Sequence, residues 1–205
     1  MSEFSIIFID DNFNAMSTLV QTMSVEFPQA DVSRIFNDPD KGVQYVLDNL
    51  DKQMIVFVDW NYKGTTKKGL SVLRSIRERT SLLYVVMMSA NQIIQNGVQN
   101  SEVIEMMNED NFYFYDSSTK DDADAVTLVK TILGKWESNF DCVLEQWLLR
   151  HPEDNGKVII SQRGVDYTWS DILKEVRMQT QFGRDFERRA NQSTIHRYKD
   201  MQNNI

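Results

Sequence analysis

Short apolar runs alternate with helix-like segments through roughly the first 135 residues, and this alternation limits the possible folds more than any other feature of the sequence. The runs occupy residues 6–9, 54–58, 82–88 and 112–115, with a weaker run at 32–36. Their short length and unbroken apolarity are typical of strands that are buried on both faces of a parallel sheet. We therefore expect a doubly wound α/β fold with five parallel strands.

The segments between these runs carry apolar residues at helical spacing. This pattern predicts helices around residues 15–27, 43–50 and 70–76, and a less clearly patterned one between 93 and 107. Asp38 and Pro39 mark the start of the second helix, because aspartate is a good N-cap and proline is favoured in the first turn.

Polar residues follow three of the predicted strands at the point where each strand ends. Asp10 and Asp11 follow the first strand, Asp59 follows the third, and Ser89 follows the fourth. Ligands collect at the carboxyl ends of the strands in doubly wound folds, so these side chains are expected to lie close together. Three neighbouring carboxylates repel one another unless a cation lies among them, and Mg²⁺ prefers oxygen ligands. One such aspartate alone would indicate only a strand cap, but the set predicts a metal site.

Three segments resemble the phosphorylation-site motifs of response-regulator receiver domains: IIFIDDN (6–12), VFVDWN (56–61) and VVMMSA (85–90). The resemblance covers about residues 4–134 and implies a flavodoxin-like receiver fold. It implies that Asp59 accepts a phosphoryl group from a histidine kinase or a phosphotransfer protein. It also implies that Asp10, Asp11 and Asp59 bind Mg²⁺ together with the backbone carbonyl of Asn61, and that Ser89 is the switch hydroxyl.

One part of the receiver pattern is displaced. Receiver domains normally end the fifth strand with a lysine, whereas here residues 112–115 are followed by DSST and only then by Lys120. Lys120 is the candidate for this role, provided that DSST loops out or continues the strand. Two interpretations stay open: a phosphorylated receiver, and a binding module that keeps the acidic pocket without phosphorylation.

Residues 122–150 read as one long helix with a heptad seam formed by Val126, Val129, Leu133, Trp136, Phe140, Val143 and Trp147. The second half of this helix would extend beyond the sheet, so its apolar residues must be buried elsewhere. The candidates are a second copy, in a homodimer through residues 136–150, and the protein's own C-terminal helix. We divide the chain into a receiver domain at 1–134 and a mostly helical output or oligomerisation extension at 135–205.

The last seventy residues contain no motif that identifies a known output domain. A short apolar run at 158–160 and a turn at 163–164 precede a helix that opens at Thr168 or Ser170. Its predicted buried stripe contains Trp169, Ile172, Val176, Phe182 and Phe186. A DNA-binding regulator that uses the Arg-rich last helix is a less favoured alternative, since a helix-turn-helix needs two short helices and the element before this one reads as a strand.

Composition excludes several other classes of function. The chain has a net charge of −8, which argues against broad attraction to nucleic acid. It has no apolar run long enough to cross a bilayer and no signal-peptide pattern, so we expect a cytoplasmic protein. With one cysteine, two histidines and no glycine-rich phosphate loop, it offers no disulfide and no recognisable catalytic group, and we do not expect an enzyme.

Overall fold

A computed structural model describes residues 4–63, 68–89, 99–136, 138–162 and 164–202. The chain divides into two compact units, Met1–Lys135 and Trp136–Ile205. Each unit is described by itself below. Among the helices that the structure describes, none has the combination of length and apolarity that a membrane span requires.

The first unit is built on a parallel sheet whose strands are β1 (Phe4–Ile9), β2 (Ala30–Asp31), β3 (Ile35–Phe36), β4 (Met54–Asp59), β5 (Tyr84–Ser89) and β6 (Phe112–Asp116). The order across the sheet is β2-β1-β4-β5-β6, and β3 also pairs with β1. The two short strands β2 and β3 therefore share one position beside β1, which leaves five positions. This is the order of flavodoxin-like doubly wound folds, so the predicted fold class is confirmed.

The sheet position beside β1 is divided between β2 and β3 because the chain turns between these two strands. Asp31 accepts hydrogen bonds at one carboxylate oxygen from both the backbone nitrogen (3.0 Å) and the hydroxyl (2.6 Å) of Ser33. A side chain that satisfies the backbone in this way competes with strand pairing. The weak apolar run predicted at 32–36 is thus a turn followed by a two-residue strand.

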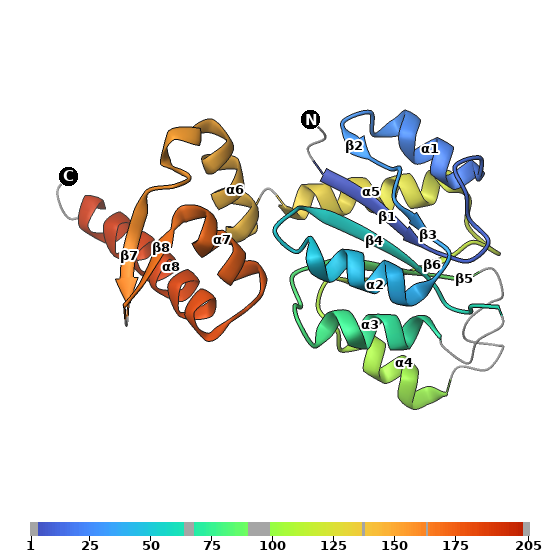
Figure 1. Ribbon diagram of the computed structural model, residues 1–205. Helices are drawn as coiled ribbons and strands as arrows, with labels where there is room; N and C mark the ends of the chain where they lie inside the picture. Colours follow the sequence, from blue (N-terminus) through green and yellow to red (C-terminus); the bar gives the residue numbers. More distant parts are fainter. Residues whose placement is uncertain (1–3, 64–67, 90–98, 137, 163, 203–205) are drawn as a thin grey trace. The chain divides into compact units, whose positions relative to one another are not determined.

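Helices cover both faces of this sheet (Figure 1). They are α1 (Thr18–Glu26), α2 (Pro39–Asp48), α3 (Gly69–Arg77), α4 (Asn100–Met107) and α5 (Asp122–Trp136). Helix α1 lies beside α5, with an ion pair between Glu26 and Lys130, while α2, α3 and α4 lie on the opposite face. Asp38 caps α2 by accepting a hydrogen bond from the backbone nitrogen of Asp40, as its position before Pro39 predicts. The predicted fourth helix is shorter than the sequence range, part of which (90–98) lies outside the described residues.

The central strands have both faces buried. Ile7 and Ile9 of β1 belong to the core cluster on the α2 and α3 side of the sheet, and the alternate residues Ile6 and Phe8 are also fully buried. Continuous apolar strands are required when helices cover both faces of a sheet. The strand ends are therefore where polar side chains become accessible.

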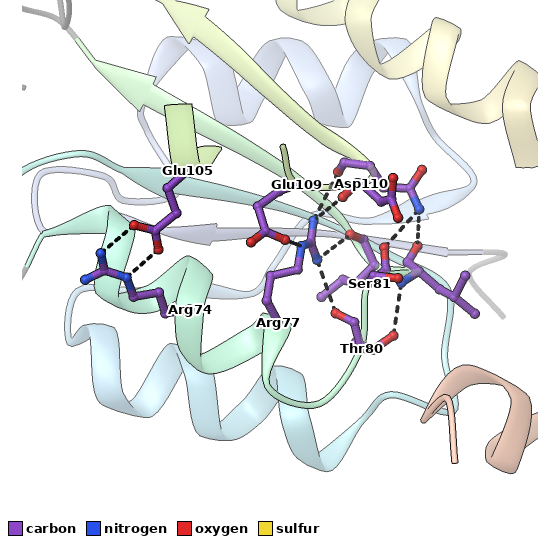
Figure 2. Close-up of polar contacts among 10 residues, drawn as sticks. Arg74, Arg77, Thr80, Ser81, Glu105, Glu109 and Asp110 are labelled. Carbon is purple, nitrogen blue, oxygen red and sulfur yellow. Dashed lines mark hydrogen bonds and ion pairs between the residues drawn. The ribbon is translucent and has the colours of Figure 1, made fainter. Parts of the chain in front are cut away.

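A polar network joins the end of α3 to the chain that follows α4 (Figure 2). The guanidinium of Arg77 forms an ion pair with Glu109 (3.2 Å) and donates hydrogen bonds to the backbone carbonyls of Asp110 (2.7 Å) and Leu83 (3.1 Å). One turn earlier in α3, Arg74 makes a two-pronged contact with Glu105 of α4 at the surface, with both nitrogen–oxygen distances at 2.6 Å. The network fixes the C-terminal end of α4 against α3.

The second unit contains α6 (Phe140–Arg150), a short 3-10 turn η1 (Pro152–Asp154), an antiparallel hairpin of β7 (Val158–Gln162) and β8 (Val165–Thr168), and the helices α7 (Trp169–Arg177) and α8 (Gln181–Gln202). Thr168 caps α7 and exchanges hydrogen bonds with Asp171. The expected start of a helix at Thr168 is therefore confirmed. The hairpin's second strand, which ends at that cap, was not expected from the sequence.

The prediction of one helix over residues 122–150 is wrong. Helix α5 ends at Trp136 and α6 begins at Phe140, with Asn139 in an extended conformation as its N-cap. Asparagine and serine favour helix caps over helix interiors, and the pair Ser138 and Asn139 stands at the break. The heptad seam therefore does not lie along one helix, because its members Trp136 and Phe140 belong to different helices. Its member Val143 is 51% exposed, whereas Cys142, Leu144 and Leu148 are buried.

Aromatic contacts within the second unit use two residues of the expected seam. The ring of Trp147 lies 5.3 Å from that of Trp169, and the ring of Phe140 lies 6.2 Å from that of Phe186. These rings pack against α7 and α8 of the same unit. The prediction of a homodimer through residues 136–150 depended on a continuous exposed seam, and the described residues do not form that seam.

The helix that the sequence predicts from Thr168 or Ser170 onward consists of two helices. Helices α7 and α8 are separated by residues 178–180, and Gln179 has a positive φ of 48°. Gly183 of α8 packs so closely on α7 that a Cβ there would lie 2.1 Å from the carbonyl oxygen of Glu175. The Arg-rich last helix, α8, therefore follows a helix, and the prediction that it follows a strand is wrong. The unit contains a pair of helices joined by a tight turn.

Candidate phosphoryl and metal site

The carboxyl ends of β1 and β4 bring three acidic side chains together. Asp10 and Asp11 directly follow β1, and Asp59 is the last residue of β4, which pairs with β1 in parallel register. One carboxylate oxygen from each of Asp10, Asp11 and Asp59 lies within 4.8 Å of the others. The structure thus gathers the three residues that the sequence analysis proposed as metal ligands.

Hydrogen bonds hold two of these carboxylates in place. Asp10 is 5% exposed and accepts a hydrogen bond from the backbone nitrogen of Asn12 (2.7 Å). Asp11 accepts one hydrogen bond from the side-chain amide of Asn12 (2.8 Å) and another from the backbone nitrogen of Lys63 (2.7 Å). The carboxylate of Asp11 is therefore held both by the segment that follows β1 and by the segment that follows Asp59.

The electrostatics of the cluster disfavour three negative charges. Burial raises the pKa of Asp59 to about 7, and the charge of Asp10 adds to this effect, while the backbone N–H group of Asn61 opposes it. Burial also raises the pKa of Asp10, with Asp11 contributing in the same direction. A divalent cation would reverse both effects, and three carboxylates are a hard oxygen donor set that suits Mg²⁺. The residues present therefore fit the ion.

Ser89 lies at the end of the neighbouring strand, as predicted. It is the last residue of β5, it is buried, and the preceding Met88 is the register partner of Asp59. Its backbone carbonyl accepts a hydrogen bond from the backbone nitrogen of Ser117 (2.9 Å). A hydroxyl residue thus stands on the strand adjacent to Asp59, while its role as a switch stays a prediction.

The residue at the end of β6 is an aspartate, and the role of Lys120 stays a prediction. Asp116 ends β6 and is the register partner of Ser89. Its carboxylate is engaged by the backbone nitrogen (3.0 Å) and hydroxyl (2.5 Å) of Ser118, and these bonds hold its pKa below the ordinary value. Lys120 lies in the following turn, where its backbone nitrogen bonds the carbonyl of Asp116 (3.0 Å). In the part of the chain that the structure describes, no hydrogen bond or ion pair joins Lys120 to the acidic cluster.

Asn61 lies two residues beyond Asp59, and its backbone forms an isolated antiparallel bridge with Lys68. Residues 64–67, between the two partners of this bridge, lie outside the described residues. The metal-binding role of the Asn61 carbonyl stays a prediction.

Three further residues shape the site, and sequence reasoning did not identify them. Tyr62 is buried and donates a hydrogen bond from its hydroxyl to the carbonyl of Ile9 (3.1 Å), which ties the loop after β4 to the end of β1. Gly69 begins α3 so close to the site that a Cβ would lie 2.5 Å from the carbonyl oxygen of Asp59. Lys63 contacts the side-chain oxygen of Asn12 through its ammonium group. The one signal in the sequence for a role at the site was that Tyr62 and Lys63 lie three and four residues after Asp59.

Binding of Mg²⁺ should change the fluorescence of Trp60, because this buried indole is adjacent to Asp59 and lies beneath the ammonium group of Lys68 at 5.5 Å. We expect a saturable change on titration of the wild type and a much weaker response in Asp11→Ala. Trp60→Phe identifies the contribution of this residue among the four tryptophans. A flat wild-type titration would count against the metal site.

Without metal, the stability of the first unit should fall as the pH rises from about 4 to about 7. The folded protein keeps a proton on Asp59 over this range, since its pKa is raised to about 7, whereas the unfolded chain releases that proton near pH 4. A group that is more protonated in the folded state loses stabilising effect as the pH rises. Urea unfolding in a chelator at several pH values measures this, with Asp59→Asn as the reference. The free-energy difference between variant and wild type should grow through this window, and a constant difference would contradict the assignment.

Comparisons with known proteins found matches among solved structures. No protein-family model matches the chain, and no curated protein matches it. A response regulator receiver domain protein from Clostridium thermocellum aligns with 15% identity and a TM-score of 0.49, covering 65% of this chain and 97% of its own. The apo receiver domain of nitrogen regulatory protein C aligns with 17% identity and a TM-score of 0.49, covering 67% of this chain and 100% of its own. The signal receiver domain of NarL from Mycobacterium tuberculosis aligns with 15% identity and a TM-score of 0.46, covering 64% and 97%. Similarity at these identities concerns the fold, which the strand order of the sheet establishes independently.

Proposed function

We propose that the first unit, which has the fold of response-regulator receiver domains, accepts a phosphoryl group on Asp59 and thereby changes the protein contacts of the chain. The observation that carries this proposal is the gathering of Asp10, Asp11 and Asp59 within 4.8 Å at the carboxyl edge of a doubly wound sheet. Ligands bind at this edge in such folds. The proposal does not make the protein an enzyme with a substrate of its own.

The transfer step needs a nucleophile, access and neutralisation of charge. A carboxylate oxygen of Asp59 would attack phosphorus, and the bond between phosphorus and the donor's leaving group would break, with the electron pair going to that group. The donor would be a phosphohistidine on a histidine kinase or a phosphotransfer protein. Mg²⁺ held by Asp10, Asp11 and Asp59, with the Asn61 carbonyl, would neutralise charge on the phosphoryl oxygens. Hydrogen bonds from Asn12 and Lys63 to the carboxylates of Asp10 and Asp11 support this proposal.

A direct test is the incubation of the full chain with acetyl phosphate in the presence and absence of Mg²⁺, followed by intact mass measurement. We expect one phosphoryl group per chain, added only when Mg²⁺ is present. A chain that gains no mass in Mg²⁺ would instead support a phosphorylation-independent binding module. Asp116 at the end of β6, where receivers normally have a lysine, is the observation that favours this second candidate.

The second unit is proposed as the output part of the chain, acting through protein contacts. Its tight helix pair α7 and α8 meets one requirement of a DNA-binding helix-turn-helix. Residues 136–205 nevertheless carry ten Lys and Arg against eleven Asp and Glu. Attraction to the phosphate backbone supplies most of the affinity for DNA, and this balance does not provide it. A protein partner is therefore the better-supported proposal.

A further inference from the structure

We propose that Lys63 supplies the positive charge beside the phosphoryl group on Asp59 that the end of β6 does not supply. The inference rests on the proposed function. It assigns a phosphoryl-binding role to a residue on the loop after β4, four positions beyond the acceptor.

The charge balance of the site calls for such a cation. A phosphorylated side chain carries about −1.5 to −2 charges near neutral pH. Asp10 and Asp11 add two more, so one Mg²⁺ leaves the site negative. The strand end nearest to Ser89 offers the carboxylate of Asp116 instead of an ammonium group. Compensation has to come from another element.

Lys63 is connected to the acidic cluster through both its backbone and its side chain. Its backbone nitrogen donates a hydrogen bond to Asp11 (2.7 Å), and its ammonium group contacts the side-chain oxygen of Asn12. Asn12 in turn donates hydrogen bonds to both Asp10 (2.7 Å) and Asp11 (2.8 Å). The ammonium group is therefore linked to two of the three carboxylates through a single residue, Asn12, whose backbone bonds Asp10 and whose side chain bonds Asp11.

The ammonium group of Lys63 can exchange its contact with Asn12 for a contact with another acceptor. Asn12 is neutral, and the contact lies at the exposed rim of the site, so little free energy holds the ammonium group there. A lysine has a flexible four-carbon stem and binds phosphate as a point charge. The side chain can leave Asn12 for a phosphoryl oxygen without any change in the backbone bond to Asp11.

Other lysines near the site have different surroundings. The ammonium group of Lys68 lies over the ring of Trp60 at 5.5 Å. Lys120 is attached to the end of β6 through its backbone, in the turn that follows Asp116. Among the described residues, Lys63 is the one whose ammonium group contacts a residue bonded to the acidic cluster.

The test measures the affinity for fluoroberyllate, a phosphoryl mimic, at saturating Mg²⁺ by Trp60 fluorescence and by calorimetry. Lys63→Gln should weaken fluoroberyllate binding on the order of tenfold, the size expected for loss of one charge-assisted hydrogen bond. Lys63→Arg should restore most of it, because the charge is retained. The affinity for Mg²⁺ alone should not weaken in Lys63→Gln, which separates charge compensation from damage to the loop.

Lys52→Gln is the matched control, since Lys52 also bonds an asparagine side-chain oxygen, that of Asn49 (2.7 Å), but lies before β4 at the opposite end of the strand. It should bind fluoroberyllate as the wild type does. Wild-type affinity in Lys63→Gln, or a loss in Lys120→Gln in its place, would overturn the assignment of Lys63 while the proposed function stands. If the wild type binds no fluoroberyllate and takes up no phosphoryl group, the proposed function fails and the assignment fails with it.

Discussion

Asp59→Asn should take up no phosphoryl group from acetyl phosphate and Mg²⁺ under conditions that modify the wild type fully. The amide has nearly the shape of the carboxylate but cannot serve as the attacking nucleophile. Asp10 is buried and both it and Asp11 are engaged by Asn12, so neither is placed to substitute for Asp59. Intact mass after brief reaction measures the result.

Two controls separate loss of the acceptor from loss of the fold. The variant should be at least as stable as the wild type without metal, because removing one of three neighbouring charges relieves repulsion. Asp116→Asn, which changes an aspartate at the end of a nearby strand, should keep full labelling. Persistent stoichiometric labelling of Asp59→Asn would place the acceptor elsewhere.

Arg177→Met should destabilise the second unit by about 3–5 kcal/mol, the usual cost of removing one member of a buried ion pair. Arg177 of α7 is 5% exposed and bonds Asp141 (3.1 Å) and Glu145 (3.0 and 3.2 Å), both from α6. Burial would lower the pKa of Arg177, but the two carboxylates outweigh it and raise that pKa. Without the guanidinium, two carboxylates are left in a largely apolar interface. Urea unfolding monitored by the fluorescence of Trp147 and Trp169 measures the loss.

The size of this effect depends on burial, which a second variant tests. Arg188→Met removes an exposed pair with Asp185 (2.9 Å) in α8 and should cost about 0–1 kcal/mol. Replacing Asp141 by Asn and Glu145 by Gln as well as Arg177 by Met should recover much of the loss, since no unpaired charge remains. Equal unfolding midpoints for Arg177→Met and wild type would show that the network does not stabilise α6 against α7.

The sheet and the acidic cluster were predictable because both follow from short-range patterns. Strands β1 and β4 contain apolar runs, acidic residues follow β1 and end β4, and parallel strands place their carboxyl ends at one edge. The contact between Lys63 and Asn12 joins positions 51 residues apart through a loop. No periodicity encodes such a contact, so the residues that orient the cluster could not be found from the sequence.

The second unit was predicted less well because a heptad pattern of apolar residues concealed the signal for a helix cap. The heptad spacing continued from Trp136 to Phe140 without interruption and outweighed the capping signal of Ser138 and Asn139. Strand β8 (Val165–Thr168) was overlooked because its four residues, VDYT, are too few for their alternation of apolar and polar side chains to stand out. Helix α8 was joined to α7 because Val176 and Phe182 were assigned to one apolar stripe, although a separation of six residues does not fit helical spacing.

The network around Arg77 holds the C-terminal end of α4 against α3 (Figure 2). Its C-terminal end is held by a buried guanidinium that bonds Glu109 and the backbone of Asp110, while the surface contact between Arg74 and Glu105 is exposed to salt. At its other end, α4 begins at Asn100, and the backbone nitrogen of Gln99 donates a hydrogen bond to the side chain of Glu102 (3.0 Å) in the first turn of the same helix. If α4 changes its angle to α3, the bonds of Arg77 keep the C-terminal end in place. The displacement of the helix would then be largest at Asn100.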